Sequence, residues 1–283
     1  MKIGIALEGG GMRGMYTAGV LDVLLDKGLQ PAMMSGTSAG AIFGINFASK
    51  QRGRTIRYNK RYMRDRRYIS LESFIKTGNL INQDFGCREL PLKLDPFDEV
   101  AFEQSGIRFF ATITNMRTGK AEYIEIKNCL EQVDVLWASS ALPIITRPVE
   151  WHGEHYLDGG LADNIPMQKC VDEGCDKIIV VLTHPYGYVK REPLKHICKL
   201  VYQDYPNLLE TIDHRNKTYN RYLAHINQLE AEEKIFVLRP SEKMTIKRLE
   251  RNADKLQGLY DLGVKDGKKQ WKALDAYLSQ TGR

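Results

Sequence analysis

The segment IGIALEGGGMRG, residues 3–14, joins a short apolar run to a glycine-rich stretch. The run Ile3–Leu7 has the length and composition of a buried parallel strand. The glycines that follow allow the backbone to turn tightly directly after that strand. Residues 15–27 then carry apolar side chains at helical spacing and stop at Gly28, a favourable helix end. This order predicts the first βα unit of an α/β fold.

The same alternation of strands and helices continues along the chain. Short apolar runs and glycine turns predict further strands at 32–35, 107–114, 121–126 and 177–183, a hairpin at 147–157, and helices at 39–50, 130–140 and 166–173. We therefore expect an α/β three-layer sandwich with a central, mostly parallel sheet. After residue 190 charged and polar residues dominate, and helical patterns cover most of 194–232 and 246–280 around one strand candidate, Lys234–Leu238. The expected division is a domain at 1–189 and a mostly helical C-terminal extension at 190–283.

Composition narrows the class of protein. The 283 residues carry a net charge of +6, too weak by itself to argue for nucleic acid. The five cysteines are odd in number and form no CxxC pair, which favours free thiols in a reducing compartment and argues against zinc. The first apolar run is shorter than a secretory signal, and no apolar stretch reaches the ~18 residues of a membrane span. We expect a cytoplasmic protein without a metal or cofactor, with peripheral membrane contact left open.

The glycine stretch can hold an anion, because its N–H groups lie at the start of a helix. That anion is either a phosphate or the oxyanion of an acyl-transfer intermediate. The pattern Gly9-x-Gly11-x-x-Gly14 matches the dinucleotide fingerprint, which also requires an acidic residue at the end of the second strand. Residues 35–38 contain no acid, and no Gly-Lys-Ser/Thr follows the glycines. Nucleotide binding is therefore disfavoured.

Two further motifs point to acyl transfer. GTSAG at residues 36–40 is a GxSxG sequence between a predicted strand and a predicted helix, the context of a nucleophile elbow. DGG at residues 158–160 follows the predicted hairpin; taken alone, Asp-Gly most often marks a turn. The glycine stretch, the serine elbow and the Asp-Gly-Gly sequence occur in this order along the chain.

In this order the motifs resemble those of the patatin-like phospholipase family. The resemblance covers about residues 1–185 and includes secondary matches at 111–119, 138–143 and 164–166. It implies a serine acyl hydrolase that cleaves carboxylic esters of lipids through a Ser-Asp dyad and an acyl-enzyme. The alternative is a regulatory or lipid-binding protein on the same fold with weak catalysis. Carried over position by position, the family pattern implies Ser38 and Asp158 as catalytic residues, Gly9, Gly10 and Gly11 as the oxyanion hole, and Arg13, Gly14, Gly36, Gly40, Gly159 and Gly160 as supporting residues.

Histidines offer a rival base. His152, His155 and His184 lie near the motifs in sequence, and a triad would need one of them. None has a spacing that a known elbow enzyme requires. Arg13 has two interpretations, a brace for the glycine stretch or a contact for a substrate phosphate, and we favour the brace.

Residues 50–67 form the most basic stretch, with nine Arg and Lys residues, one acid and interleaved tyrosines. Such a stretch is either a solvated helix face or a contact for anionic phospholipid head groups. Nucleic acid is not expected, since no recognisable nucleic-acid module accompanies it. The sequence leaves the lipid class and the oligomeric state open.

Overall fold

The computed structural model describes residues 1–191 and 195–280, and of residues 195 and 196 it describes the backbone alone. The strands are β1 Ile3–Leu7, β2 Met33–Thr37, β3 Arg108–Asn115, β4 Ala121–Ile126, β5 Val149–Trp151, β6 Glu154–Asp158, β7 Lys177–Val181 and β8 Phe236–Leu238. The α-helices are α1 Met15–Asp26, α2 Ala39–Ala48, α3 Arg54–Tyr62, α4 Leu71–Thr77, α5 Glu99–Glu103, α6 Val133–Ser139, α7 Met167–Asp172, α8 Lys195–Val201, α9 Pro206–Ala231 and α10 Ala253–Ser279. Shorter turns of helix are η1 Gly11–Gly14, η2 Phe85–Leu94 and η3 Gly159–Leu161.

The strands of the described chain form one eight-stranded sheet of order β5-β6-β3-β2-β1-β7-β8, with β4 paired to β3 beside this path. The five strands from β3 to β8 along this path pair in parallel, whereas β4, β5 and β6 pair antiparallel. The predicted α/β fold with a central, mostly parallel sheet is confirmed. The strands expected from apolar runs agree with the observed ones to within two residues.

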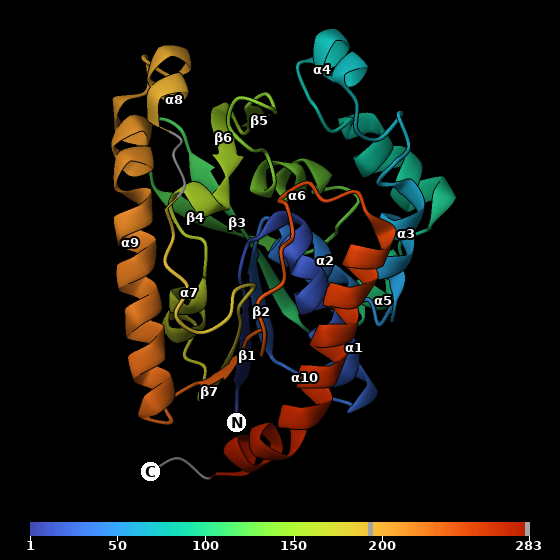
Figure 1. Cartoon of the computed structure of the whole chain (residues 1–283), viewed down its shortest axis with the longest axis vertical. Helices are drawn as coiled ribbons and strands as arrows, with labels where there is room; N and C mark the ends of the chain where they lie inside the picture. The colour runs from blue at the N-terminus through green and yellow to red at the C-terminus, as the bar shows by residue number, and fades with distance from the viewer. Residues whose placement is uncertain (192–194, 281–283) are drawn as a thin grey trace.

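Helices cover both faces of the sheet, which gives the expected three layers (Figure 1). Alternate residues of the central strands enter different cores: Ile5 and Leu7 pack with α1, α2 and α10, whereas Ala6 packs with α7 and α9. This alternation follows from the two-residue period of a strand. Strands buried on both faces read as continuous apolar runs, which is why β1 and β7 were recognisable in the sequence.

Strands β2 and β6 meet end to end along β3. Thr37 at the end of β2 pairs with Thr112, and Asp158 at the end of β6 pairs with the next residue, Ile113. Ile113 also pairs with Glu122 of β4, so β4 occupies the other edge of β3. The antiparallel β6 therefore runs toward the end of β2 on the edge that β2 leaves free. The register places Asp158 directly beside the residue that follows Thr37.

The C-terminal region shares this sheet and both of its faces. β8 extends the sheet by pairing with β7, α9 lies on one face and α10 packs against α1 on the other (Figure 1). The helical runs expected over most of 194–232 and 246–280 are confirmed within the described residues. The first comprises α8 and α9, which are separated by the segment before Pro206, because proline favours the first turn of a new helix. The second is α10, which begins at Ala253 because Asn252 caps it.

The basic stretch 50–67 contains α3, which lies beside α10. Its tyrosines Tyr58 and Tyr62 are buried. Several of its cations are held by carboxylates: Arg52 by Asp26, Arg54 and Arg57 by Asp95, and Arg67 by Asp65 and Glu89. In the part of the chain that the structure describes, every helix is too short or too polar to cross a bilayer.

Candidate active site

Ser38 lies in the sharp turn between β2 and α2. Its backbone angles are φ 54° and ψ −121°. Residues other than glycine adopt such angles only with backbone strain, at a cost of about 1–3 kcal/mol. Two glycines make this turn sterically feasible. A Cβ on Gly36 would lie 2.6 Å from backbone atoms of Gly40, and a Cβ on Gly40 would collide with the carbonyl of Leu7. The strand, the strained serine and the helix together form the predicted elbow.

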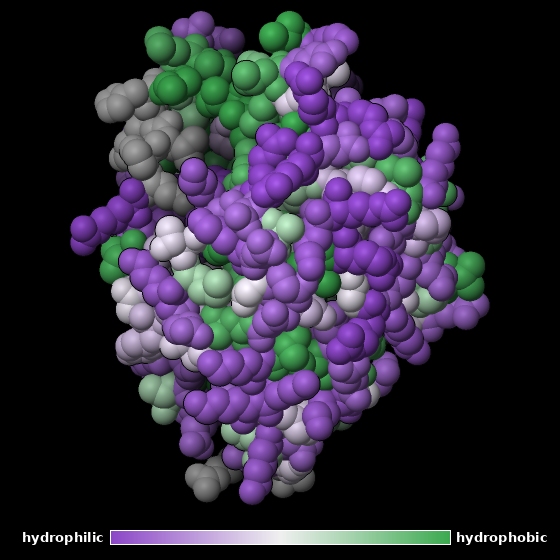
Figure 2. Space-filling model, turned by 45° about the vertical axis from the view of Figure 1, so that its right-hand side comes forward, coloured by the Kyte–Doolittle hydropathy of each residue, from purple (hydrophilic) through white to green (hydrophobic). Residues whose placement is uncertain are grey.

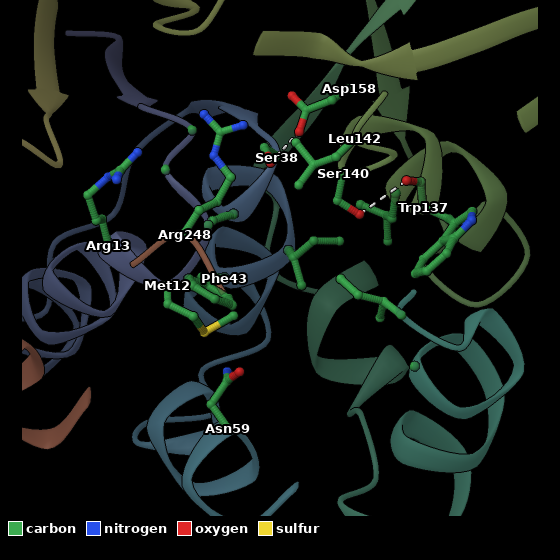
Figure 3. Close-up of a pocket in the computed structure, with 18 of the residues that line it drawn as sticks. Met12, Arg13, Ser38, Phe43, Asn59, Trp137, Ser140, Leu142, Asp158 and Arg248 are labelled. Atoms are coloured by element: carbon green, nitrogen blue, oxygen red, sulfur yellow. Dashed lines mark hydrogen bonds between the residues drawn. The ribbon is translucent and has the colours of Figure 1, made fainter. Parts of the chain in front are cut away.

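Asp158 accepts a hydrogen bond from the hydroxyl of Ser38. The Oγ of Ser38 donates to Oδ2 of Asp158 at 2.7 Å (Figure 3). The other oxygen, Oδ1, accepts the N–H of Gly160 at 2.7 Å, so the turn at Gly159 and Gly160 orients the carboxylate. Asp158 is buried, and this burial raises its pKa despite the hydrogen bonds from Ser38 and Gly160, which lower it. A carboxyl group with a raised pKa takes up a proton more readily near neutral pH.

The glycine stretch lies across the same pocket. The N–H of Gly9 donates to the carbonyl of Asn164 at 3.0 Å, which commits it to holding the turn. The N–H groups of Gly10 and Gly11 make no hydrogen bond within the described residues, and both glycines line the pocket with Ser38. The set of predicted oxyanion donors therefore narrows to these two. Gly11 has φ +57°, and a Cβ there would lie 2.5 Å from the carbonyl oxygen of Arg248.

Glu8 is a buried carboxylate that sequence analysis did not single out. Its side chain accepts the N–H and hydroxyl of Thr183 at 2.6 and 3.0 Å, the Nδ2 of Asn164 at 3.1 Å and the hydroxyl of Tyr219 at 2.5 Å. These bonds join the start of the glycine stretch to the end of β7 and to α9. The signal available in the sequence was the position of Glu8 directly after a buried strand. A carboxylate at such a position is expected to be buried and therefore to need several hydrogen-bond partners.

The C-terminal region completes the pocket. Arg215 of α9 donates its Nε to the carbonyl of Gly160 at 2.7 Å. Arg248, in the loop before α10, accepts the N–H of Met12 on its carbonyl at 2.9 Å. Its side chain lines the pocket, as does that of Arg13 (Figure 3). Arg215, Tyr219 and Arg248 therefore belong to the site, although no motif marks them.

The other predicted residues lie as follows. Arg13 lines the pocket, and Gly14 packs against the ring of Phe43. His184 also lines the pocket, where its ring stacks on that of Tyr188 at 3.5 Å. His152 and His155 belong to the β5–β6 hairpin. The hydroxyl of Ser38 donates to the aspartate and not to a histidine.

Apolar side chains form most of the remaining pocket wall (Figure 3). They come from several separate segments of the chain, and examples are Met12, Phe43, Tyr68, Leu90, Trp137 and Leu142. A wall of this kind accepts a hydrocarbon chain and keeps water from it. Ser38 and Asp158 lie together in this pocket, whereas Asn59 lines it away from them (Figure 3).

The fold and the site define an α/β protein that presents a strained, carboxylate-bonded serine at the carboxyl edge of its sheet. A family model described as patatin-like phospholipase matches residues 5–170, and the chain belongs to that family. A second model, a domain of unknown function called DUF6363, matches residues 205–279.

Similar proteins include the uncharacterized protein YjjU of Escherichia coli, 32% identical over 190 residues, which are 65% of this chain and 52% of that protein. Lysophospholipase NTE1 of Candida glabrata is 28% identical over 63% of this chain and 10% of its own length. The chain thus spans about half of the bacterial relative and a tenth of the yeast one. The crystal structure of VipD from Legionella pneumophila aligns over 92% of this chain and 66% of VipD, with 15% identity and a TM-score of 0.40.

Proposed function

We propose that this protein is a serine acyl hydrolase that cleaves a carboxylic ester of a lipid through a Ser38–Asp158 dyad. The observation that carries the proposal is the 2.7 Å hydrogen bond from Ser38 to the buried Asp158 at the end of a largely apolar pocket. The name lysophospholipase among the relatives makes lysophospholipids the first substrates to test. Peripheral contact with a membrane belongs to the same proposal.

In the first half of the reaction Asp158 takes the proton of the Ser38 hydroxyl as the oxygen attacks the ester carbonyl. The N–H groups of Gly10 and Gly11 receive the oxyanion, each contributing about 3–4 kcal/mol where the geometry is good. The protonated Asp158 then gives its proton to the leaving alcohol, and the acyl group stays on Ser38. In the second half Asp158 activates a water molecule, which releases the fatty acid and restores the serine.

The alternative is a regulatory or lipid-binding protein on this fold. Backbone strain at Ser38 favours the enzyme, because strain persists where the surrounding structure enforces it and is concentrated at functional sites. A binding protein has no need of a serine held against a carboxylate.

A fluorophosphonate probe tests the assignment. We expect one adduct per chain, on Ser38, by intact mass and peptide mapping, and no adduct on Ser38→Ala. Within a panel of lysophospholipids, phospholipids and short-chain esters, hydrolysis should be seen with the wild-type protein and not with Ser38→Ala. Labelling that persists in Ser38→Ala would remove the serine from its role. An unlabelled and inactive wild type would favour the lipid-binding alternative.

A further inference from the structure

Two short helices expose large apolar side chains at one end of the molecule. In α4, Leu71 and Ile75 are 74% and 83% exposed and Phe74 is partly exposed, whereas Ser73 is buried. In α8, Leu200 is 80% exposed beside the exposed Ile197 and Val201, and Cys198 is buried. Both sets have the i, i+3, i+4 spacing of a helix face that normally packs inward. We call these six residues the apolar rim: Leu71, Phe74, Ile75, Ile197, Leu200 and Val201.

The apolar rim lies at the end of the molecule toward which the active site faces. β1 runs upward from the N-terminus in Figure 1, so the carboxyl ends of the parallel strands, where Ser38 lies, face the end that carries α4 and α8. Figure 2 shows hydrophobic side chains gathered at this end on both sides of a hollow. Exposed apolar groups gathered around one region mark a contact surface more often than scattered ones do.

Both helices continue segments that line the active-site pocket. Tyr68 and Ile81 line it on either side of α4, and a β-bridge between Ile69 and Ile81 closes the base of that segment. Tyr188 lines the pocket ahead of α8. After α8, Tyr202 is buried and its hydroxyl accepts the N–H of Ile144 at 3.1 Å, close in sequence to the pocket wall. The segments that lead into α4 and α8 therefore also contribute to the pocket wall.

The charge around the apolar rim is nearly balanced. Residues 64–94, which contain α4 and overlap the basic stretch, carry six Arg and Lys against four Asp and Glu, and three of the cations, Arg67, Lys76 and Arg88, are held by carboxylates. Amphipathic helices with apolar side chains on one face and cations beside them bind in the interfacial plane of a bilayer. The basic stretch 50–67 is less suited, because Tyr58 and Tyr62 are buried and present no apolar surface to a bilayer.

We propose that the apolar rim docks this protein on lipid membranes, with α4 and α8 inserted on either side of the pocket mouth. The proposal rests on the proposed function, since a lipid ester must leave the bilayer and enter the pocket without crossing water. Insertion places the apolar pocket wall in continuity with the acyl chains. Because the contact is mainly apolar, binding persists at high salt and on neutral vesicles, and anionic lipid strengthens it modestly.

The test combines binding and hydrolysis. Binding is measured by co-sedimentation with phosphatidylcholine vesicles, with and without anionic phosphatidylglycerol, in a Ser38→Ala background. Leu71→Ser with Ile75→Ser, and separately Leu200→Ser, should weaken binding about tenfold or more. Val100→Ser and Val171→Ser are matched controls, because both valines are exposed on other helices. In the Ser38 enzyme the rim variants should lose vesicle-lipid hydrolysis in proportion and keep turnover of soluble p-nitrophenyl butyrate.

The contrary outcomes are distinct. Unchanged vesicle binding by the rim variants overturns the proposal. Loss of binding on charge reversal at Arg61 and Arg64, with no loss in the rim variants, assigns the contact to the basic stretch instead. A dimer in sedimentation velocity that becomes a monomer in the rim variants makes the rim a contact between copies. If the wild type binds through the rim but hydrolyses neither substrate, the proposed function fails while docking stands.

Discussion

Residues 5–170 and residues 205–279 build the same pocket in different ways. The first region supplies Ser38, Asp158 and the glycine stretch, each from a turn at the end of a strand. The second supplies Arg215 and Tyr219 from the side of a long helix, and Arg248 from the loop before α10. The turns are marked by glycines, whereas the residues of the second region carry no local mark.

The difference separates reacting groups from the groups that hold them. Tyr219 bonds Glu8, 211 residues away, and Arg248 holds Met12 through its backbone carbonyl. Both bonds end on the glycine stretch or directly beside it. The C-terminal region therefore fixes the position of the predicted oxyanion donors without supplying one. Variants of the reacting groups should therefore lose more ester turnover than variants of the groups that hold them.

The largest effect is expected at the dyad. Asp158→Asn keeps an oxygen that can accept the N–H of Gly160 but cannot take a proton, so ester turnover should fall about 10³-fold or more. His152→Ala, His155→Ala and His184→Ala should each keep activity within about fivefold, because the serine donates directly to the aspartate. Short-chain ester hydrolysis by the four variants under one set of conditions measures this.

Thermal melting shows whether each of these variants is folded. A well-folded histidine variant that is as inactive as Asp158→Asn would contradict the dyad and make that histidine the base. His184 is the most informative of the three, since it lines the pocket.

The same comparison explains what could be predicted from the sequence. The strands β1 and β7 are continuous apolar runs, and Ser38 and Asp158 stand beside glycines that a tight turn requires. These features are local, so a single sequence displays them. The meeting of Ser38 with Asp158 depends on how β2 and β6 share an edge of β3, which no local pattern specifies, so it was implied only by the family resemblance.

The ties from the C-terminal region could not be predicted for the same reason. A tyrosine on an amphipathic helix is usually part of a core, and nothing near Tyr219 in sequence indicates a carboxylate partner. β8 was recognisable as a strand candidate, but its pairing with β7 was not. Arg248 lies in a segment whose composition resembles the helix that follows, so the loop and turn that bring it against the glycine stretch were missed.

An intermediate effect is expected at Tyr219. Tyr219→Phe removes one hydrogen bond from the buried carboxylate of Glu8, which should lower the free energy of unfolding by about 1.5–3 kcal/mol. Because Glu8 begins the glycine stretch, ester turnover should also fall about tenfold. Urea unfolding and steady-state kinetics on the same preparations measure the two effects.

Tyr260→Phe is the matched control for this variant. The hydroxyl of Tyr260 donates to the carboxylate of Asp22 in α1 at 2.6 Å. Like the Tyr219–Glu8 pair, this bond ties the C-terminal region to the N-terminal part of the chain, but neither residue lines the pocket. The variant Tyr260→Phe should lose stability to a similar extent and keep its rate of ester turnover. Equal losses of turnover in the two variants would show that Tyr219 acts through general stability and not through the glycine stretch.

The smallest effect is expected at the side chain of Arg248. Burial raises the pKa of Asp158, and the charges of Arg248 and Arg215 lower it again in part. Arg248→Gln removes one of these cations and leaves the backbone bond to Met12 in place, so the pKa of Asp158 should rise further. Arg248→Lys retains the charge and should behave as the wild type does.

The sign of the pH dependence follows from the form of Asp158 that reacts. In the proposed dyad the carboxylate accepts the proton of Ser38, so activity should fall as the pH drops through the pKa of Asp158. A higher pKa in Arg248→Gln moves this acid limb of kcat/KM to higher pH, with a loss of only a few-fold on the limb, the size of one screened charge interaction. Above the limb, where Asp158 is ionised in both proteins, the two profiles should converge.

Added salt screens the charge of Arg248, so it should move the acid limb of the wild type to higher pH and move the limb of Arg248→Gln less. An acid limb of Arg248→Gln at or below the wild-type pH would mean that this arginine does not act on the dyad through its charge, which would leave Arg215 as the cation of the C-terminal region to test next.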